Sequence, residues 1–141
     1  MFGVIRESDD ESKRERPGKA VASTASSTPS NAPAASRYGD LLFISGQLPL
    51  DGQGNALPLD APVEDQARLA LENVRTVLET NQLNMANVVS MTVYLTDLDD
   101  LAAFDVVAAD FFKRGLPPRS VVGVSQLPRG AKVQVSAVAG R

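Results

Sequence analysis

Residues 88–112, VVSMTVYLTDLDDLAAFDVVAADFF, decide the fold, because their hydrophobic pattern changes period half-way along. The first part alternates, as in a strand with one buried face. The expected buried face holds Val89, Met91, Val93 and Leu95, and the opposite face holds Ser90, Thr92, Tyr94 and Thr96. The second part has helical spacing, with an apolar stripe of Leu101, Phe104, Val107, Ala108 and Phe111. A strand that leads into an amphipathic helix predicts helices packed on a sheet.

The ends of this helix carry the expected signals. Asp97 or Asp99 is expected to cap its start, because a short acidic side chain accepts hydrogen bonds from the free amides there. The same role explains the acidic cluster that these residues form with Asp100 better than a magnesium site does. Lys113 and Arg114 are expected in the last turn, and the glycine and prolines that follow end the helix.

The flanking segments supply the other elements of an α+β fold. LLFIS (41–45) is apolar on both strand faces, with Leu42 and Ile44 opposite Leu41 and Phe43, so we expect a strand covered on both sides. Residues 48–58 predict a hairpin or loop, 62–83 an amphipathic helix, and 120–124 and 131–138 two more strands. This order predicts a single-layer sheet with two helices on one face.

Residues 1–30 are polar, charge-dense and then rich in Ser, Thr and Ala, so they predict a flexible extension before a domain at 31–141. Residues 19–24, KAVAST, alternate weakly and are a possible edge strand. We expect ordered structure to begin at Leu41. The first residues lack a signal-peptide apolar stretch, which predicts a cytoplasmic protein without membrane contact.

The composition excludes several chemistries. The chain has neither Cys nor His, so it has no thiol nucleophile and no His-based triad, and we expect no metal and no cofactor. From residue 20 onward it carries 9 basic and 12 acidic residues, and it has two Tyr and no Trp. A net-acidic domain with few aromatic residues argues against nucleic-acid binding.

The face of the sheet away from the helices is expected to mix Ser, Thr, Tyr and Gln with apolar residues. Such a surface is too apolar to remain in water and too polar for a core. We therefore expect an oligomer that packs this face against sister subunits, with a ligand pocket between them.

Three positions are candidates for chemistry. Arg119 follows two prolines at the start of a strand, where a guanidinium could bind a small carboxylate bidentately, and an ordinary surface arginine is the alternative. Ser45 and Gly46 close the first apolar strand; glycine allows a ligand close to the backbone, and a simple strand end is the alternative. Gln134 could orient a water molecule but cannot take its proton, or it is merely a residue of the sheet face.

Four segments together resemble the Rid family (YjgF, translation-initiation-inhibitor-like, endoribonuclease L-PSP-like): GDLLFISGQLPLD, ALENVRTVLE, VVSMTVYLTDLDDLAAFDVVAADFF and PPRSVVGVSQLPRGAKVQVSAVA. The similarity runs from about Arg37 to Ala139. It implies a chorismate-mutase-like α+β fold and a homotrimer with pockets between subunits. It also implies hydrolysis of reactive enamine or imine intermediates such as 2-aminoacrylate to a keto acid and ammonia.

The resemblance also implies roles for individual residues. It places the carboxylate-binding arginine at Arg119, the pocket serine and glycine at Ser45 and Gly46, and a backbone ligand contact at Val121. Arg119 and Gln134 take the catalytic positions. The glutamate that active members use to handle the hydrolytic water is replaced by Gln134.

The pocket tyrosine of the family is missing. Ala32 stands at its position, and Tyr38 comes six residues later.

Three functions follow from these features. The first is an imine or enamine deaminase, slowed by the loss of the carboxylate at position 134. The second is a non-catalytic trimeric binder of small carboxylates or keto acids through Arg119. The third, an RNA-cleaving or translation-inhibiting role, ranks last because the folded part is net acidic.

Overall fold

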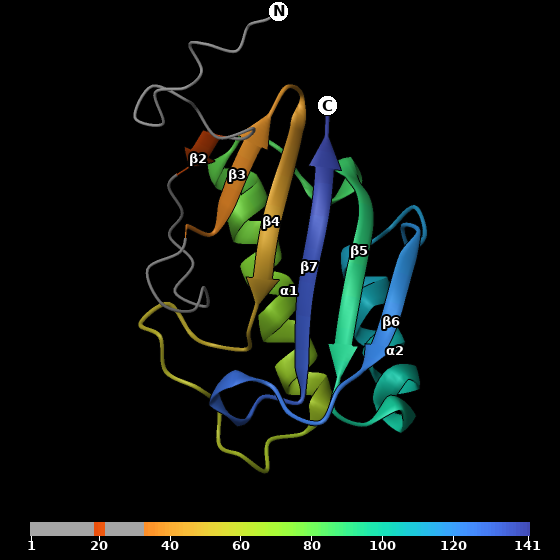
Figure 1. The fold of residues 1–141 in the computed structure, drawn as a ribbon. Coiled ribbons are helices and arrows are strands. Elements are labelled where there is room, and N and C mark those ends of the chain that lie inside the picture. The colour runs from red at the N-terminus through yellow and green to blue at the C-terminus, as the bar shows by residue number, and fades with distance from the viewer. Residues whose placement is uncertain (1–18, 22–32) are drawn as a thin grey trace, which may run out of the picture.

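A computed structural model describes residues 19–21 and 33–141 and shows one sheet with two helices behind it (Figure 1). The strands are β2 (Lys19–Val21), β3 (Ala35–Tyr38), β4 (Leu41–Gln47), β5 (Val88–Leu95), β6 (Arg119–Gly123) and β7 (Val133–Gly140). The helices are α1 (Val63–Thr80) and α2 (Leu101–Phe111), and the 3₁₀ turns are η3 (Met85–Asn87), η4 (Leu98–Asp100) and η5 (Pro128–Gly130). The predicted α+β class with both helices on one sheet face is confirmed.

The strands follow the order β2-β3-β4-β7-β5-β6 across the sheet. All neighbours are antiparallel except β5 and β6, because α2 carries the chain from the end of β5 back to the start of β6. Two strands, β7 and β5, therefore lie between β4 and the edge strand β6. This spacing decides which candidate residues one chain can bring together.

The core lies between the sheet and the helices. α1 turns a face of Ala67, Ala70, Leu71, Val74, Val77 and Leu78 to the sheet. From the sheet, Leu42, Ile44, Met91, Val93, Leu95, Val133, Val135 and Ala137 point to the helices and are buried. Full burial of one such aliphatic side chain contributes about 1.5–3 kcal/mol, so this layer is the main source of stability.

The expected buried face of β5 is wrong at one position. Val89 is 49% exposed, and Val88 is buried in its place. The pairing with β7 shifts between Val88 and Ser90, which marks a β-bulge at the start of β5. A bulge adds one residue to a strand, so the alternation counted back from Leu95 ends on the wrong residue.

The two faces of β4 also differ from the expectation. Leu42 and Ile44 are buried, whereas Leu41 is 38% exposed and Phe43 is 43% exposed. A strand covered on both sides is therefore wrong for the single chain. Leu41 and Phe43 belong to the face that carries no helix, together with Val122 of β6, and we call this the open face.

The start of ordered structure was also placed too late. β3 precedes β4 and pairs with it in an antiparallel hairpin, and β2 pairs with β3 as the edge strand. The weak alternation of 19–24 thus does mark a strand at residues 19–21, while 22–24 lie outside the described residues. The short sequence ASRY of β3 has too few apolar side chains to show a pattern.

The ends of α2 differ from the prediction as well. Asp97 caps the 3₁₀ turn η4 by accepting a hydrogen bond from the Asp99 amide, and α2 begins one turn later. The helix ends at Phe111, so Lys113 and Arg114 lie in the following loop and not in its last turn. Capping as the role of Asp97 is confirmed, at a different turn.

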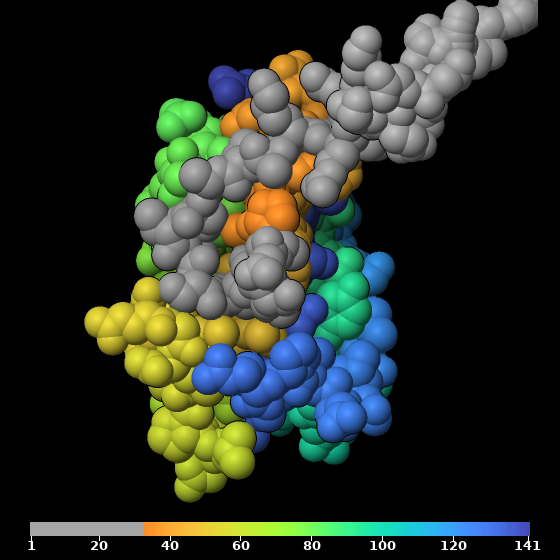
Figure 2. All heavy atoms as spheres, turned by 60° about the vertical axis from the view of Figure 1, so that its left-hand side comes forward, coloured from red at the N-terminus to blue at the C-terminus, as the bar shows by residue number. Residues whose placement is uncertain are grey.

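Two loops lie side by side at the end of the sheet toward which β4 runs, as Figure 2 shows in yellow for residues 48–60 and in blue for residues 124–132. Leu48, Leu50 and Ala131 form a small apolar cluster there. The buried Asn73 of α1 donates to the Leu48 and Leu50 carbonyl oxygens, at 2.9 and 2.8 Å. One amide group thereby anchors the segment that directly follows the Ser45–Gly46 strand end.

Candidate functional site

Arg119 begins β6, the edge strand of the sheet. It pairs in register with Met91 of β5, so its side chain leaves the sheet on the same side as the buried Met91, toward the helices. There it meets Asp105 of α2: Arg119 Nη1 donates to Asp105 Oδ1, and Nη2 donates to Oδ2 at 3.0 Å. The guanidinium is thus fixed by a two-point ion pair and is not a free surface arginine.

This ion pair is only partly shielded from solvent. The Arg119 side chain is 20% exposed and that of Asp105 is 35% exposed. The hydrogen bonds to Asp105 raise the pKa of Arg119 further above its ordinary value, so it is charged at every physiological pH. A guanidinium has five N–H donors, and the two bonds to Asp105 leave three for another acceptor.

Two other candidates, Gly46 of β4 and Gln134 of β7, are in contact with one another. The β4–β7 pairing is irregular between Ile44 and Gln47, and Gly46 lies in this irregular stretch. A Cβ atom built on Gly46 would come within 2.2 Å of Gln134 Nε2. The Gln134 amide therefore occupies the space that a side chain at position 46 would fill.

Ser45 is bound to the neighbouring strand region. Its hydroxyl and its backbone amide both donate to the Ala34 carbonyl oxygen, each at 2.9 Å. The hydroxyl thus has an acceptor, and no base adjoins it in the described structure that would activate it. Ser45 holds the β4 bulge in shape beside Gly46.

The candidate residues form two groups that one chain keeps apart. Gln134 pairs with Tyr94, so its side chain lies on the open face, whereas Arg119 and Val121 pair with residues of the helix-covered face. Gln134 on β7 lies two strand spacings from β6, and Ser45 and Gly46 on β4 lie three. At about 4.8 Å per strand, these spacings correspond to roughly 10 and 14 Å across the sheet. The first group, with Gly46 and Gln134, lies at the β4–β7 bulge. The second group contains the fixed cation Arg119 on the edge strand β6.

Comparison with known proteins identifies the fold and its relatives. The family model described as endoribonuclease L-PSP matches residues 23–140, most of the chain. This chain belongs to that family, the Rid (YjgF) family. The resemblance inferred from its sequence is thereby confirmed.

Some relatives of this chain have deaminase names. TdcF of Escherichia coli strain K12, provisionally named a reactive intermediate deaminase, is 40% identical over 106 residues, or 73% of this chain and 81% of TdcF. A protein of Dermatophagoides farinae named 2-iminobutanoate/2-iminopropanoate deaminase is 30% identical over 104 residues, covering 74% of this chain and 80% of the relative.

A solved structure of the Rid family shows the same fold. The crystal structure of Escherichia coli TdcF with bound serine superposes with a TM-score of 0.80 at 35% identity, covering 87% of this chain and 98% of that one.

Other family positions are less informative in this chain. Ala32, at the position of the pocket tyrosine, lies outside the described residues. Tyr38 ends β3 and is 58% exposed.

Within residues 19–21 and 33–141 there is no group of three His, Cys, Asp or Glu side chains that could hold a metal ion. None of the described helices is long and apolar enough to cross a membrane.

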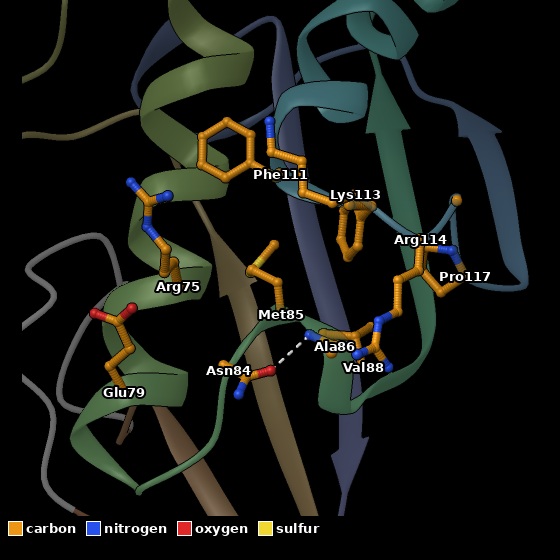
Figure 3. A pocket seen from close by; sticks show the side chains of 12 residues that line it. Arg75, Glu79, Asn84, Met85, Ala86, Val88, Phe111, Lys113, Arg114 and Pro117 are labelled. Atoms are coloured by element: carbon orange, nitrogen blue, oxygen red, sulfur yellow. Dashed lines mark hydrogen bonds between the residues drawn. The ribbon is translucent and has the colours of Figure 1, made fainter.

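Sequence reasoning missed Asp105. It lies beside the apolar stripe of α2 and 14 residues before its partner, and its spacing from Arg119 suggests no contact. The available signal was a charged residue directly after Phe104, the first buried residue of α2. Sequence reasoning also missed a hollow on the helix side of the chain, which none of the candidate residues lines (Figure 3).

Proposed function

We propose that this chain hydrolyses reactive enamine or imine intermediates of the 2-aminoacrylate type to a keto acid and ammonia. The observation that carries the proposal is Arg119, a permanently charged group held in one orientation on the edge strand. Its presence in a Rid-family chain 30–40% identical to proteins with deaminase names supports the assignment. The unused N–H donors of Arg119 are suited to a planar carboxylate.

The complete site requires a second copy of the chain. Arg119 projects from an edge strand, where no further strand of its own sheet intervenes. Gln134 lies two strands away on β7, and Ser45 and Gly46 lie three strands away on β4. The edge of one copy placed against the open face of another would bring the groups together. The exposed Leu41, Phe43 and Val122 on the open face support such an assembly, and we propose that it is the homotrimer expected from the family.

In this site the chain would act mainly by positioning the substrate and the attacking water molecule. Arg119 holds the substrate carboxylate, and an enamine first becomes the imine when its β-carbon gains a proton. Water then adds to the imine carbon, and the carbinolamine breaks its C–N bond to release ammonia and leave the keto group. The Gln134 amide can align this water by hydrogen bonds but cannot accept its proton, so proton transfers depend on solvent.

Asp105 is the positioning residue for Arg119. It fixes the guanidinium orientation, which lowers the entropy lost when the substrate carboxylate binds. Its negative charge also offsets part of the positive charge that attracts the substrate. Asp105 therefore lowers the affinity of Arg119 for the substrate carboxylate while it keeps the guanidinium in one orientation.

The direct test follows iminopyruvate released by an amino-acid oxidase, in the presence of the wild-type chain or of Arg119→Ala. We expect the wild type to accelerate the loss of the imine and the variant to lose at least tenfold of that acceleration. Arg68→Ala is the matched control, because Arg68 also pairs with a carboxylate of α2, Asp110, on the exposed helix side. Equal activity of the wild type and Arg119→Ala would refute the role of Arg119.

The replacement of an acid by Gln134 favours a second function, a non-catalytic binder of small carboxylates. Calorimetry with 2-oxobutyrate, on the wild type and on Arg119→Ala, measures binding without chemistry. Gln134→Glu restores the family's acid and is expected to raise imine hydrolysis about 10²-fold if the site is catalytic. Binding through Arg119 with no hydrolysis by either the wild type or Gln134→Glu would establish the binder instead.

A further inference from the structure

A hollow of about 320 Å³ opens on the helix side of the chain. It lies between the second half of α1, the 3₁₀ turn η3 and the loop that leads from α2 to β6 (Figure 3). Ser45, Gly46, Arg119, Val121 and Gln134 do not line it. Its volume is within the range of small-molecule sites, so its lining decides what it could bind.

The floor of the hollow is apolar and partly aromatic. Met85, Val88, Phe111 and Phe112 line it, and each is 7–8% exposed. Met85 lies in the middle of the view in Figure 3, with Phe111 above it. Thioether sulfur and phenyl edges both make favourable contacts with an aromatic ring. A flat aromatic group fits this floor better than a polar one does.

The rim of the hollow is positively charged, although the whole chain has a net charge of −3. Three exposed cations, Arg75, Lys113 and Arg114, surround the apolar floor, against the single carboxylate of Glu79. The ion pairs within residues 19–21 and 33–141 are Arg68–Asp110 and Arg119–Asp105, so the rim cations have no carboxylate partner there.

The two sides of the rim are arranged differently. The Arg75 guanidinium lies 4.9 Å from the centre of the Phe111 ring and so extends the aromatic wall on the α1 side. On the other side, Lys113 and Arg114 belong to the loop after α2 (Figure 3). Their side chains extend in opposite directions, Lys113 toward Phe111 and Arg114 toward Ala86 and Val88, so an anionic group bound there would meet one of the two cations.

We propose that this hollow binds an aromatic carboxylate, with its ring on Met85, Phe111 and Phe112 and its carboxylate at one of the two loop cations, Lys113 or Arg114. The site is separate from the one that includes Arg119, and it does not depend on the proposed deaminase function. An apolar floor bordered by cations that pair with no carboxylate in the described part of the chain matches a ligand with a hydrophobic body and one negative charge.

The test uses 2-naphthoate as the probe and backbone amide NMR of the full chain as the readout. We expect saturable shifts at η3 and at the end of α2, with a dissociation constant on the order of 1 mM for a ligand of this size. The neutral 2-naphthamide should bind more weakly. The shifts should persist in Arg119→Ala, which separates this site from the proposed deaminase site.

Two variants examine the site itself. Lys113→Ala combined with Arg114→Ala should weaken 2-naphthoate binding about threefold to tenfold, since each exposed ion pair contributes modestly. Ala86→Trp should abolish binding, because it places an indole at the mouth of the hollow from an exposed position that tolerates a larger side chain. Arg68→Ala, an exposed cation of α1 outside the hollow, is the control and should bind as the wild type does.

Each remaining outcome overturns the proposal. Shifts confined to Gly46 and Arg119 would assign the probe to the other site. Unchanged affinity in the double alanine variant would show that the rim cations take no part. Equal binding of the amide and the carboxylate would show that the hollow selects no charge.

Discussion

On the face of the sheet that the helices cover, Met91, Val93 and Leu95 are buried, whereas on the open face Phe43 and Val122 remain exposed in the single chain. Both sets belong to the same sheet. The covered face is completed by α1 and α2 of the same chain, so its residues are explained by folding. The open face and the β6 edge contain the candidate site and are not completed by the chain itself. Stability and assembly should therefore respond separately to substitutions on the two faces.

The largest effect is expected on the covered face, at Phe104 of α2, which is 0% exposed. Phe104→Ala removes a buried ring and leaves a cavity, so it should lower the free energy of unfolding by about 3–5 kcal/mol. Urea denaturation measures the change. Val106→Ala, on the exposed side of the same helix, should change it by less than about 0.5 kcal/mol. Similar losses in both variants would contradict the assignment of the core.

The next effect concerns the polar residue Asn73 within the covered layer. Asn73→Ala leaves the Leu48 and Leu50 carbonyl oxygens without their donor, so we expect a loss of about 2–4 kcal/mol. Thr76→Ala is the control, since its hydroxyl bonds within the helix to Glu72 and holds no loop. If Asn73→Ala destabilised no more than Thr76→Ala, the anchoring of this loop would be disproved.

On the open face, Phe43→Ser should leave the folded chain nearly as stable while weakening its assembly. Burial of this ring between subunits contributes about 1.5–3 kcal/mol, so the dissociation constant should rise more than tenfold. Sedimentation over a range of concentrations measures it. Leu59→Ser, in an exposed loop position, should leave the assembly unchanged. A wild-type chain that remained monomeric at all concentrations would refute the two-copy site.

At the edge of the sheet, Asp105→Asn should tighten the binding of 2-oxobutyrate about threefold to tenfold. The asparagine keeps an oxygen to accept from Arg119 but removes the charge that opposes the ligand. Asp105→Ala should bind less tightly than Asp105→Asn, because it also loses the orientation of Arg119. Calorimetry compares the three proteins. Weaker binding by Asp105→Asn than by the wild type would overturn the positioning role.

The smallest effect is a pH dependence at Asp51, in the loop beyond β4. Hydrogen bonds from the Asn55 and Gln53 amides lower the pKa of this carboxyl below its ordinary value of 3.8. The stabilisation is complete above that value and disappears as the pH falls through the lower folded pKa. The Tm difference between the wild type and Asp51→Ala should therefore shrink between pH 6 and pH 2. A difference that stays constant would exclude the ionised carboxylate as its source.

The sequence by itself determined the fold class, the helix-covered face and the family. Periodic burial leaves a periodic pattern, which is why Met91, Val93, Leu95 and the stripe of α1 were read correctly. The start of ordered structure was missed because β3 is short and poor in apolar residues. The face of Val89 was wrong because a bulge changes register without changing composition.

The tertiary structure alone decided how the candidate residues are arranged. Arg119 and Gln134 were both identified from the sequence, but strand order and register place them on different faces, with β5 between their strands. The pairing of Arg119 with Asp105 and the packing of Gln134 on Gly46 were likewise invisible in the sequence. The reason is physical: a pattern along one segment records which side of that segment is buried, whereas contacts between segments depend on where the whole chain places them.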